Sequence, residues 1–324
     1  MSRPSAFVPL AVTERSGLDE SVHFGSVVVL GADGSIVFSA GDPTTTVYPR
    51  SSNKPMQAVA MVRAGLDLPP DQLALVCASH DGTPEHLAAA RHILAGAGLD
   101  ELALGNTPGL PLDEHAAHTV LRHGGGRTPL QMNCSGKHAG MLATCVVNGW
   151  PHDHSYLDAQ HPLQRHITAT IDELIGTPVD HVGVDGCGAP AHAMSLVALA
   201  TGFAAIAAGR AGAAGDAVRR AMTAHPDMVG GERRDVTAFI RHVPGLIAKD
   251  GAEGVFAAAL PDGRAVALKI ADGSDRARAP VMMSALERAG VDTSEVAPIV
   301  VQHIRGHDRS VGVVRSLLDG HGAR

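Results

Sequence analysis

The sequence predicts an α+β fold with a mixed or antiparallel sheet, because strand patterns lie near both ends of the chain and helical patterns fill its middle. The middle, roughly residues 84–245, carries apolar residues at helical spacing, and glycines separate its segments. No internal repeat, low-complexity tract or linker interrupts the 324 residues. We therefore expect a single domain, residues 1–324, in which the N- and C-terminal strands share one sheet.

The N-terminal third contains both kinds of element. Residues 27–30 and 36–39 are apolar and flank a turn rich in Gly and Asp, which predicts a β-hairpin. Residues 54–64 have helical spacing and a proline in the first turn, where its missing N–H is tolerated. Residues 73–78 fit a buried strand or a short apolar helix, and a helix is predicted over residues 84–95.

Helices are predicted for most of the middle, over residues 136–147, 163–175, 190–208 and 213–224. The C-terminal part begins with the clearest hairpin of the chain, residues 254–260 and 264–270 on either side of a Pro-Asp-Gly turn. A helix over residues 277–289 and a strand over residues 310–314 complete the prediction. These strands would extend the sheet that the N-terminal hairpin begins.

Composition argues against several classes of protein. A net charge of −7, a pI near 6.2 and 3% aromatic residues do not suit nucleic-acid binding, which uses basic surfaces and stacking rings. No segment reaches the roughly 18 apolar residues of a membrane span, and residues 1–9 lack the apolar core of a leader peptide. The four cysteines are too few for a disulfide framework. We expect a cytoplasmic protein with reduced thiols, in which Cys77 and Cys145 pack as small apolar side chains.

Two glycine-flanked cysteines form the most reactive pattern. Cys134 opens the segment Cys-Ser-Gly-Lys-His, and Cys187 follows Asp185 in the segment Gly-Val-Asp-Gly-Cys-Gly. Two thiolates together with Lys137 suit a zinc ion if the lysine is deprotonated, and His138 and Asp185 would then be outer groups. One alternative is a packed thiol beside a surface lysine, because the spacing matches no zinc-finger or Cys-x-x-Cys signature. Another is a redox pair formed by Cys134 and Cys187.

A second pattern, Ser51-x-x-Lys54, supplies a nucleophile and a base. A serine hydroxyl attacks only when a base takes its proton, and a lysine serves as that base when burial or a nearby cation such as Arg50 lowers its pKa. The alternative is a capping serine followed by a surface lysine.

Three further residues complete the candidates. Ser79 and His80 follow the apolar segment 73–78 and precede an Asp-Gly turn, and Lys249 lies in a glycine-rich segment before the C-terminal hairpin. Taken singly, they read as a turn with a capping serine and as a solvated lysine.

The order of these motifs resembles that of the thermolabile asparaginase II family, the rhizobial-type or class 3 asparaginases. The matching segments are Arg50-Ser51-x-x-Lys54-Pro55, Cys77-Ala78-Ser79-His80, Cys134-Ser135-Gly136-Lys137-His138, Asp185-Gly186-Cys187, His225-Pro226-x-Met228-Val229 and Lys249-x-Gly251-Ala252. The Cys-Ser-Gly-Lys-His segment is the most specific of them. The resemblance runs from about residue 7 to at least residue 270, and the region after Ile270 gives no clear match.

The resemblance implies a fold similar to serine β-lactamases and glutaminases, hydrolysis of L-asparagine to L-aspartate and ammonia, and a homodimer. It implies two Ser-Lys pairs, Ser51 with Lys54 and Ser79 with Lys249, and it leaves open which serine is acylated. It also implies a zinc ion that assists substrate binding on Cys134, Lys137 and Cys187. The expected substrate contacts are Arg50, as the cation for the α-carboxylate, His80 and Asp185.

Other functions fit parts of the pattern. A glutaminase would act on a substrate one methylene longer. A β-lactamase-like serine amidohydrolase shares Ser-x-x-Lys, although its Ser-Asp-Asn and Lys-Thr-Gly tripeptides are absent from the sequence. A non-catalytic, zinc-dependent amino-acid-binding protein would need Cys134, Lys137 and Cys187 but would tolerate the loss of Ser51 or Lys54.

Overall fold

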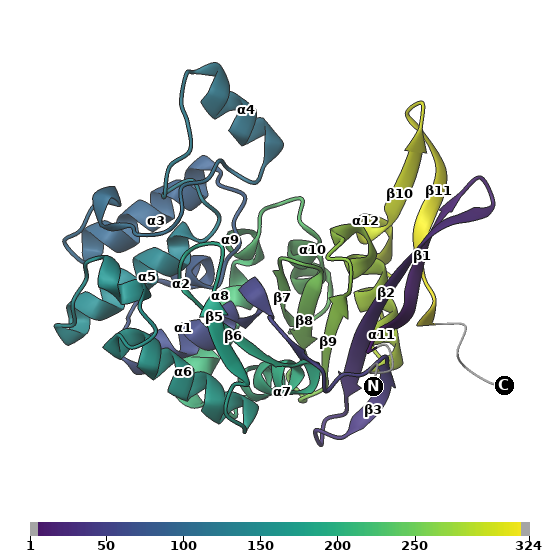
Figure 1. Cartoon of the computed structure of the whole chain (residues 1–324), viewed down its shortest axis with the longest axis horizontal. Helices are drawn as coiled ribbons and strands as arrows, with labels where there is room; N and C mark the ends of the chain where they lie inside the picture. The colour runs from purple at the N-terminus through teal and green to yellow at the C-terminus, as the bar shows by residue number, and fades with distance from the viewer. Residues whose placement is uncertain (1–5, 319–324) are drawn as a thin grey trace, which may run out of the picture.

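The computed structural model describes residues 6–318, so residues 1–5 and 319–324 of the predicted domain lie outside the described part. A sheet-containing part and a helical part meet along one edge of the main sheet (Figure 1). One hydrophobic core runs through both parts. Within residues 6–318 no single helix is long and apolar enough to cross a membrane, and the only candidate is a pair of helices bent by 90°.

The main sheet is antiparallel throughout, with strand order β10-β11-β1-β2-β9-β8-β7 and with β3 paired to β2. Its strands are β1 (Val8–Arg15), β2 (Leu18–Leu30), β3 (Ile36–Ala40), β7 (Ile247–Gly251), β8 (Val255–Ala259), β9 (Ala265–Ile270), β10 (Gln302–Gly306) and β11 (Arg309–Ser316). N-terminal strands pair with C-terminal ones, with Val28 opposite Ala267 and Val12 opposite Arg315. This arrangement confirms the predicted α+β class and the shared terminal sheet.

Two helices cover the centre of the main sheet. Helix α7 (Leu196–Ala207) packs against β8, β9 and β2, and α11 (Arg278–Arg288) packs against β9, β11 and β2. Every residue of β8 is buried. Burial of both faces explains why this strand is continuously apolar, since a strand with one solvated face would alternate.

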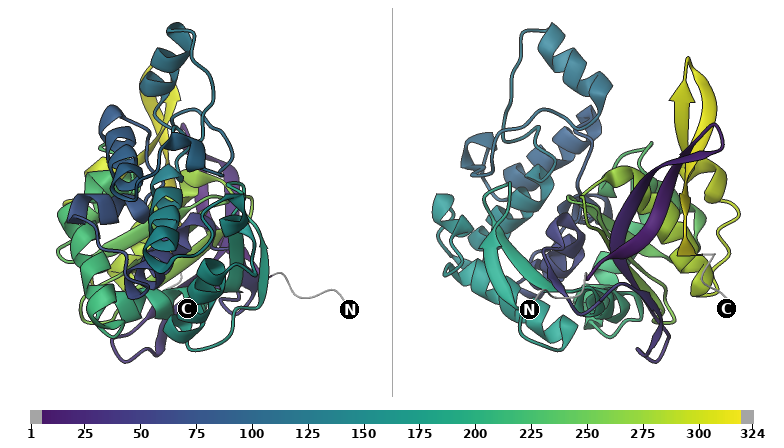
Figure 2. Two further views of the ribbon diagram at one scale, coloured as in Figure 1. Left: turned by 90° about the vertical axis from the view of Figure 1, so that its left-hand side faces the viewer. Right: turned by 45° about the vertical axis from the view of Figure 1, so that its right-hand side comes forward.

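The helical part is built around α1 (Lys54–Arg63), in which Lys54 to Met61 are all buried. The 3-10 turn η1 (Arg50–Asn53) leads into it. The other helices are α2 (Pro70–Val76), α3 (Pro84–Gly96), α4 (Glu114–Arg122), α5 (Ser135–Asn148), α6 (Pro162–Ile175), α8 (Gly212–Ala224), α9 (Pro226–Val229), α10 (Asp235–His242) and α12 (Ala297–Val300). Short 3-10 turns are η2 (Glu101–Ala103), η3 (His154–Leu157) and η4 (Asp275–Ala277). Helix α4 projects from the body, and none of its residues is buried (Figure 2).

A second, small sheet has strand order β4-β6-β5. It consists of β4 (Thr46–Val47), β5 (His181–Val184) and β6 (Pro190–Ser195). The turn between β5 and β6 carries Asp185 and Cys187 and therefore presents the second cysteine motif at a hairpin tip.

The predicted helix over residues 190–208 is wrong in its first part, because residues 190–195 form strand β6 and only α7 is helical. The alanine-rich sequence favours a helix, but strands on both sides of β6 bond its backbone, and such pairing overrides a weak local propensity. Of the two structures considered for residues 73–78, the helix is confirmed, since α2 ends at Val76. Lys249 lies in the middle of β7 and not in a turn.

Candidate active site

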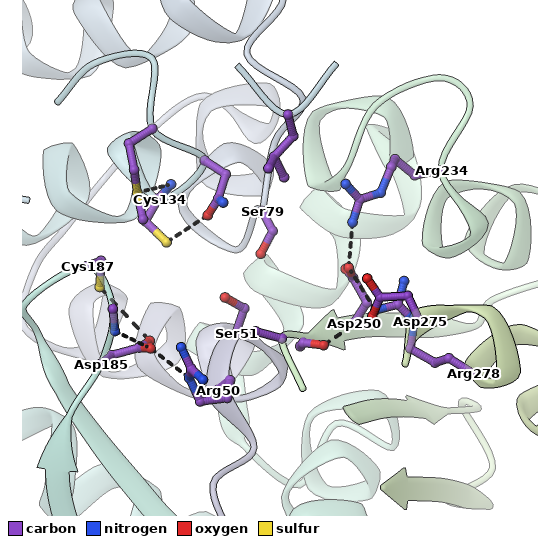
Figure 3. A pocket seen from close by; sticks show the side chains of 16 residues that line it. Arg50, Ser51, Ser79, Cys134, Asp185, Cys187, Arg234, Asp250, Asp275 and Arg278 are labelled. Atoms are coloured by element: carbon purple, nitrogen blue, oxygen red, sulfur yellow. Dashed lines mark hydrogen bonds and ion pairs between the residues drawn. The ribbon is translucent and has the colours of Figure 1, made fainter. Parts of the chain in front are cut away.

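A cavity of about 260 Å³ opens where the helical part meets the edge strand β7. The predicted site residues that line it are Arg50, Ser51, Ser79, Cys134, Asp185 and Cys187 (Figure 3). The side chains of Ser51 and Ser79 point into the same central space (Figure 3). The structure thus brings together motifs that are far apart in the sequence.

A strained turn presents Ser51 to the cavity. Arg50 has a φ of +53°, a left-handed conformation that is costly for a residue with a Cβ. Its Nε donates a hydrogen bond to Asp185 Oδ1 at 2.7 Å. On the other side of the turn, a Cβ on Gly251 of β7 would lie only 2.8 Å from Ser52 Oγ. The ion pair and the close approach of β7 therefore hold η1 against the edge of the sheet.

Lys54 lies in the first turn of α1 and is 1% exposed. Its Nζ donates to the Ala78 carbonyl oxygen, to Ser79 Oγ at 3.3 Å and to Cys134 Sγ at 3.1 Å. No hydrogen bond joins Lys54 to Ser51 within residues 6–318. The expected pair of Ser51 and Lys54 is therefore not hydrogen-bonded, and Lys54 lies beside the second serine, Ser79.

Lys249 is completely buried on β7, so the solvated-lysine interpretation is wrong. Its Nζ contacts the carboxylate of Asp250 and donates to the Asp250 carbonyl oxygen at 2.8 Å. Burial lowers the pKa of Lys249 to about 8, against the attraction of Asp250 and with the help of the charges of Lys54 and Arg234. No hydrogen bond in the described part of the chain joins Lys249 to Ser79, the second expected pair.

Backbone hydrogen bonds fix the loop that carries Ser79. The Ser79 N–H donates to the Val229 carbonyl at 3.1 Å, and the Asp81 N–H donates to the Gly230 carbonyl at 2.7 Å. The N–H of the intervening histidine donates to the Asn133 carbonyl at 3.1 Å. The loop is thus held between the residue before Cys134 and the end of α9. This explains why the His-Pro-x-Met-Val motif accompanies the site.

His80 lies behind the wall of the cavity and is fully buried. Its Nε2 shares a hydrogen bond with Ser135 Oγ at 2.9 Å, and its ring stacks on His86 at 5.2 Å. Burial and the nearby charges of His86 and Lys54 hold the pKa of His80 well below its usual value, so the ring is neutral. The cavity lining does not include His80, which corrects the expectation of a substrate contact.

The two cysteine motifs meet at the opposite end of the cavity. Lys137 Nζ donates to Cys187 Sγ at 3.3 Å, and Cys134 and Cys187 share one small apolar cluster. The neighbouring Cys134 thiol and then the Lys137 charge lower the pKa of Cys187, while the neighbouring Cys187 and burial raise the pKa of Cys134. His138 bonds Tyr156 through Nδ1 at 2.7 Å, and its buried Nε2 has no hydrogen-bond partner within residues 6–318.

These donors fit the predicted zinc ion. Two sulfur atoms and one amine nitrogen converge from α5 and from the β5–β6 turn, and Zn²⁺ prefers sulfur and nitrogen ligands. Across residues 6–318, no group of three or more His, Cys, Asp and Glu side chains could hold a metal. An ion at Cys134 and Cys187 would therefore depend on Lys137. Zinc binding stays a prediction.

The far wall of the cavity is charged, and the motifs did not point to it. It is formed by Arg234, Asp250, Asp275 and Arg278. Arg278 pairs with Asp235 at 3.0 Å and with Asp275 at 3.0 Å, and it lies 3.6 Å from Asp250. The only signal in the sequence is the pair Lys249-Asp250 inside an otherwise apolar strand.

Lysine scarcity is a stronger signal for the site. The chain has only four lysines, and all but Lys269 are buried here. Because a lysine is almost never fully buried without a partner, three buried lysines within three motifs indicate a built site.

Comparison with known proteins identifies the family. The family model for L-asparaginase II matches residues 11–316. Among solved structures, the chain is similar to a β-lactamase from Mycobacterium bovis, with 16% identity over 77% of this chain and 88% of that chain and a TM-score of 0.37. It is also similar to Mglu in its native form, with 13% identity over 81% of this chain and 62% of that chain and a TM-score of 0.37. The comparison with curated proteins gives no match.

The fold class rests on the sheet and helices of the chain itself, and the family rests on a match over nearly its whole length. This chain belongs to the L-asparaginase II family and is an amidohydrolase.

Proposed function

We propose that the protein hydrolyses L-asparagine to L-aspartate and ammonia through a serine acyl-enzyme. The observation that supports this best is the meeting of Ser51 and Ser79 at one cavity, with the buried amines of Lys54 and Lys249 behind the wall. A serine hydroxyl beside a desolvated lysine is the arrangement that acyl transfer requires.

The Arg50–Asp185 pair is the proposed site for the amino-acid head group. The two side chains are 25% and 14% exposed, so both still reach the cavity. Arg50 would bind the α-carboxylate of the substrate, and Asp185 would bind its α-ammonium group. Three arginines and three aspartates line the cavity, and this balance favours a zwitterion without net charge over a dicarboxylate.

In the proposed reaction, Ser51 Oγ attacks the carboxamide carbon, and its proton passes to Lys54 by way of Ser79, which faces the same central space. The C–N bond then breaks, and the departing nitrogen receives a proton through Ser79, whose Oγ lies 3.3 Å from Lys54 Nζ. Ammonia leaves, and water then attacks the Ser51 ester. The proton of this water passes to Lys249, the proposed base of the second Ser-Lys pair, and returns to Ser51 Oγ as the ester C–O bond breaks. The direct bond between Lys54 and Ser79 also supports the opposite assignment, with Ser79 as the acylated residue.

Zinc would be held by Cys134, Lys137 and Cys187 in this proposal. The bound ion supplies a fixed positive charge at the wall of the cavity. The chain itself holds the thiols in place, and Asp185, 4.0 Å from the Cys187 sulfur, connects them to Arg50. We include a cytoplasmic homodimer in the proposal as the working state.

The test is ammonia release from L-asparagine, L-glutamine and a chromogenic β-lactam by the zinc-supplied protein. We expect release from asparagine, and a decrease of about 10³-fold or more in Ser51→Ala and in Lys54→Met. Mass spectrometry of the quenched enzyme should detect an aspartyl ester on Ser51.

Other outcomes would replace the proposal. An ester found on Ser79, with activity retained in Ser51→Ala, would make Ser79 the nucleophile. Release from glutamine alone would indicate a glutaminase, and opening of the lactam alone a β-lactamase. Binding of asparagine without release would indicate an amino-acid-binding protein.

A further inference from the structure

Arg234, which directly precedes α10, joins the two halves of the site. Its Nη1 donates to Asp81 Oδ1 at 3.3 Å, and its Nη2 donates to Asp250 Oδ2 at 2.7 Å. Asp81 follows Ser79 by two residues in the helical part, and Asp250 directly follows Lys249 on β7. One guanidinium group therefore links the loop that carries Ser79 to the strand that carries Lys249. Figure 3 shows its bond to Asp250.

The geometry of this bridge requires an arginine. The carboxylates of Asp81 and Asp250 are 11% and 4% exposed, and both are bonded from one side chain. A guanidinium group is a planar fork that can bond two carboxylates at once, whereas an ammonium group is a compact point charge. The backbone leaves room for the bridge, because a Cβ on Gly231 would overlap the Asp81 carboxylate.

Asp250 is shared between the bridge and the buried lysine. Its Oδ1 contacts Lys249, its Oδ2 accepts from Arg234, and Arg278 of α11 lies 3.6 Å from Oδ2. These three cations outweigh burial and hold the pKa of Asp250 well below its usual value. The guanidinium group thus partly neutralises the carboxylate of Asp250, whose negative charge would otherwise stabilise the protonated form of Lys249.

The remaining ionisable groups near Lys249 come from two other helices. Lys54 on α1 repels its charge, as Arg234 does. The Cys77 thiol, at the end of α2, is kept neutral because burial raises its pKa to about 12. Asp250 is therefore the anion that opposes loss of the Lys249 proton, and Arg234 is bonded directly to it.

We propose, building on the hydrolase function above, that Arg234 is a positioning residue that aligns Ser79 with Lys249 and keeps the Lys249 amine able to lose its proton near neutral pH. Removal of the guanidinium group would leave Lys249 and the more distant Arg278 as the cations beside Asp250. The rising limb of the rate against pH would then move to higher pH, because the amine would stay protonated longer.

The experiment measures kcat and KM for asparagine from about pH 6 to 10 in wild type, Arg234→Met and Arg234→Lys. We expect Arg234→Met to lower kcat about tenfold or more, with KM within about threefold, and to move the rising limb upward. Arg234→Lys keeps the positive charge but cannot bond both carboxylates. It should therefore return the rising limb of the pH-rate profile to its wild-type pH, while kcat stays reduced. Arg233→Met is the control, because Arg233 is exposed and makes no hydrogen bond within residues 6–318.

A second readout needs no substrate. The side chains of only four lysines titrate in an NMR experiment on ¹³C-lysine-labelled protein, and Lys249→Met assigns the signal. We expect Lys249 to titrate at higher pH in Arg234→Met than in wild type. Circular dichroism will show whether Arg234→Met folds. If it does not, a reduced kcat in Arg234→Lys, with the rising part of the pH-rate profile at the wild-type pH, supports the bridge.

An unchanged Lys249 titration and an unchanged kcat would overturn the inference. A rise in KM alone would also overturn it and make Arg234 a substrate contact. Wild-type protein that releases no ammonia would refute the proposed function, while the NMR titration would still decide the role of Arg234.

Discussion

Burial sets the chemistry of the individual lysines. Lys54, Lys137 and Lys249 are among the largest fully buried side chains of the described part of the chain. An ammonium group in such a position needs partners, and each lysine has them in an oxygen or a sulfur atom. The partners differ, because Lys137 faces thiols and Lys249 faces a carboxylate. The same residue type thus serves metal binding at one wall and proton transfer at another in the proposed mechanism.

The first prediction concerns Lys249 and pH. Its pKa of about 8 lies below that of an ordinary lysine, and a base works only when neutral, so the rate should rise with pH through about 8. Lys249→Met should lower kcat by about 10²-fold or more. Steady-state rates across the pH range test both statements. Lys269→Met, at the lysine outside the site, should keep wild-type rates, and a flat wild-type profile would remove Lys249 as a base.

The second prediction concerns Cys187 and zinc. Loss of one of two sulfur donors should abolish stoichiometric zinc in Cys187→Ala and raise KM more than it lowers kcat, because the ion is proposed to assist binding. Metal analysis by mass spectrometry measures the first effect and steady-state kinetics the second. Cys145→Ala also removes a buried thiol and should retain zinc. One zinc per chain in Cys187→Ala would exclude this cysteine as a ligand.

At the scale of helices and strands, close packing between α2 and α5 positions the cysteine site. Helix α5 starts directly after Cys134, and its first turn is pressed against the end of α2. A Cβ on Gly136 would lie 2.6 Å from the Leu75 carbonyl oxygen, so only glycine permits this approach. The glycine of the Cys-Ser-Gly-Lys-His motif is therefore a packing residue, and it fixes the position of the Cys134 thiol relative to Lys54.

The third prediction follows from this contact. Gly136→Ala should lower the free energy of unfolding by about 1–3 kcal/mol, because the added methyl group forces the helices apart. It should also weaken zinc binding, since α5 carries Cys134 and Lys137. Denaturant unfolding and a zinc competition assay measure these effects. Gly96→Ala is the matched control, because a Cβ there meets no atom within 4 Å and alanine favours the helix.

If Gly136→Ala has the same free energy of unfolding as wild type, α2 moves to accommodate the methyl group without cost. The motif glycine would then serve the approach of a ligand and not the packing of the two helices.

The whole molecule is held together across the cavity. The hydrophobic core is continuous from the sheet to the helices, and the chain crosses between the two parts at η1 and again before β7. Charged contacts at the cavity add to this, since Asp250 of the sheet is bonded to Arg234 of the helical part. Such coupling favours one cooperative folding unit.

The fourth prediction is a single unfolding transition. The one tryptophan, Trp150, follows α5 and reports on the helical part, whereas far-ultraviolet circular dichroism reports on all elements. Midpoints from the two probes should coincide in urea, as two-state unfolding requires. A fluorescence transition at lower urea than the dichroism transition would divide the predicted single domain into two.

The α+β class, most element positions and the reactive residue types could be predicted from the amino-acid sequence. These follow from periodicity and turn chemistry, which are local. The sequence also contains the motifs of the family in the expected order, and the family match over residues 11–316 agrees with this order. The strand over residues 190–195 could not be predicted from the sequence. Pairing with β4 and β5, and not local propensity, makes that segment extended.

Which side chains face each other depends on the packing of segments that are distant in the sequence. The spacing Ser-x-x-Lys predicts contact within one helical turn, yet the Lys54 amine reaches across to Ser79 because α2 and α5 close around it. His80 was expected at the substrate and lies behind the wall, since its loop is bonded on both sides by distant segments. Arg234 and Arg278 enter the site for a similar reason. Contacts over long separations arise from packing of the whole chain, and no local pattern in the sequence encodes them.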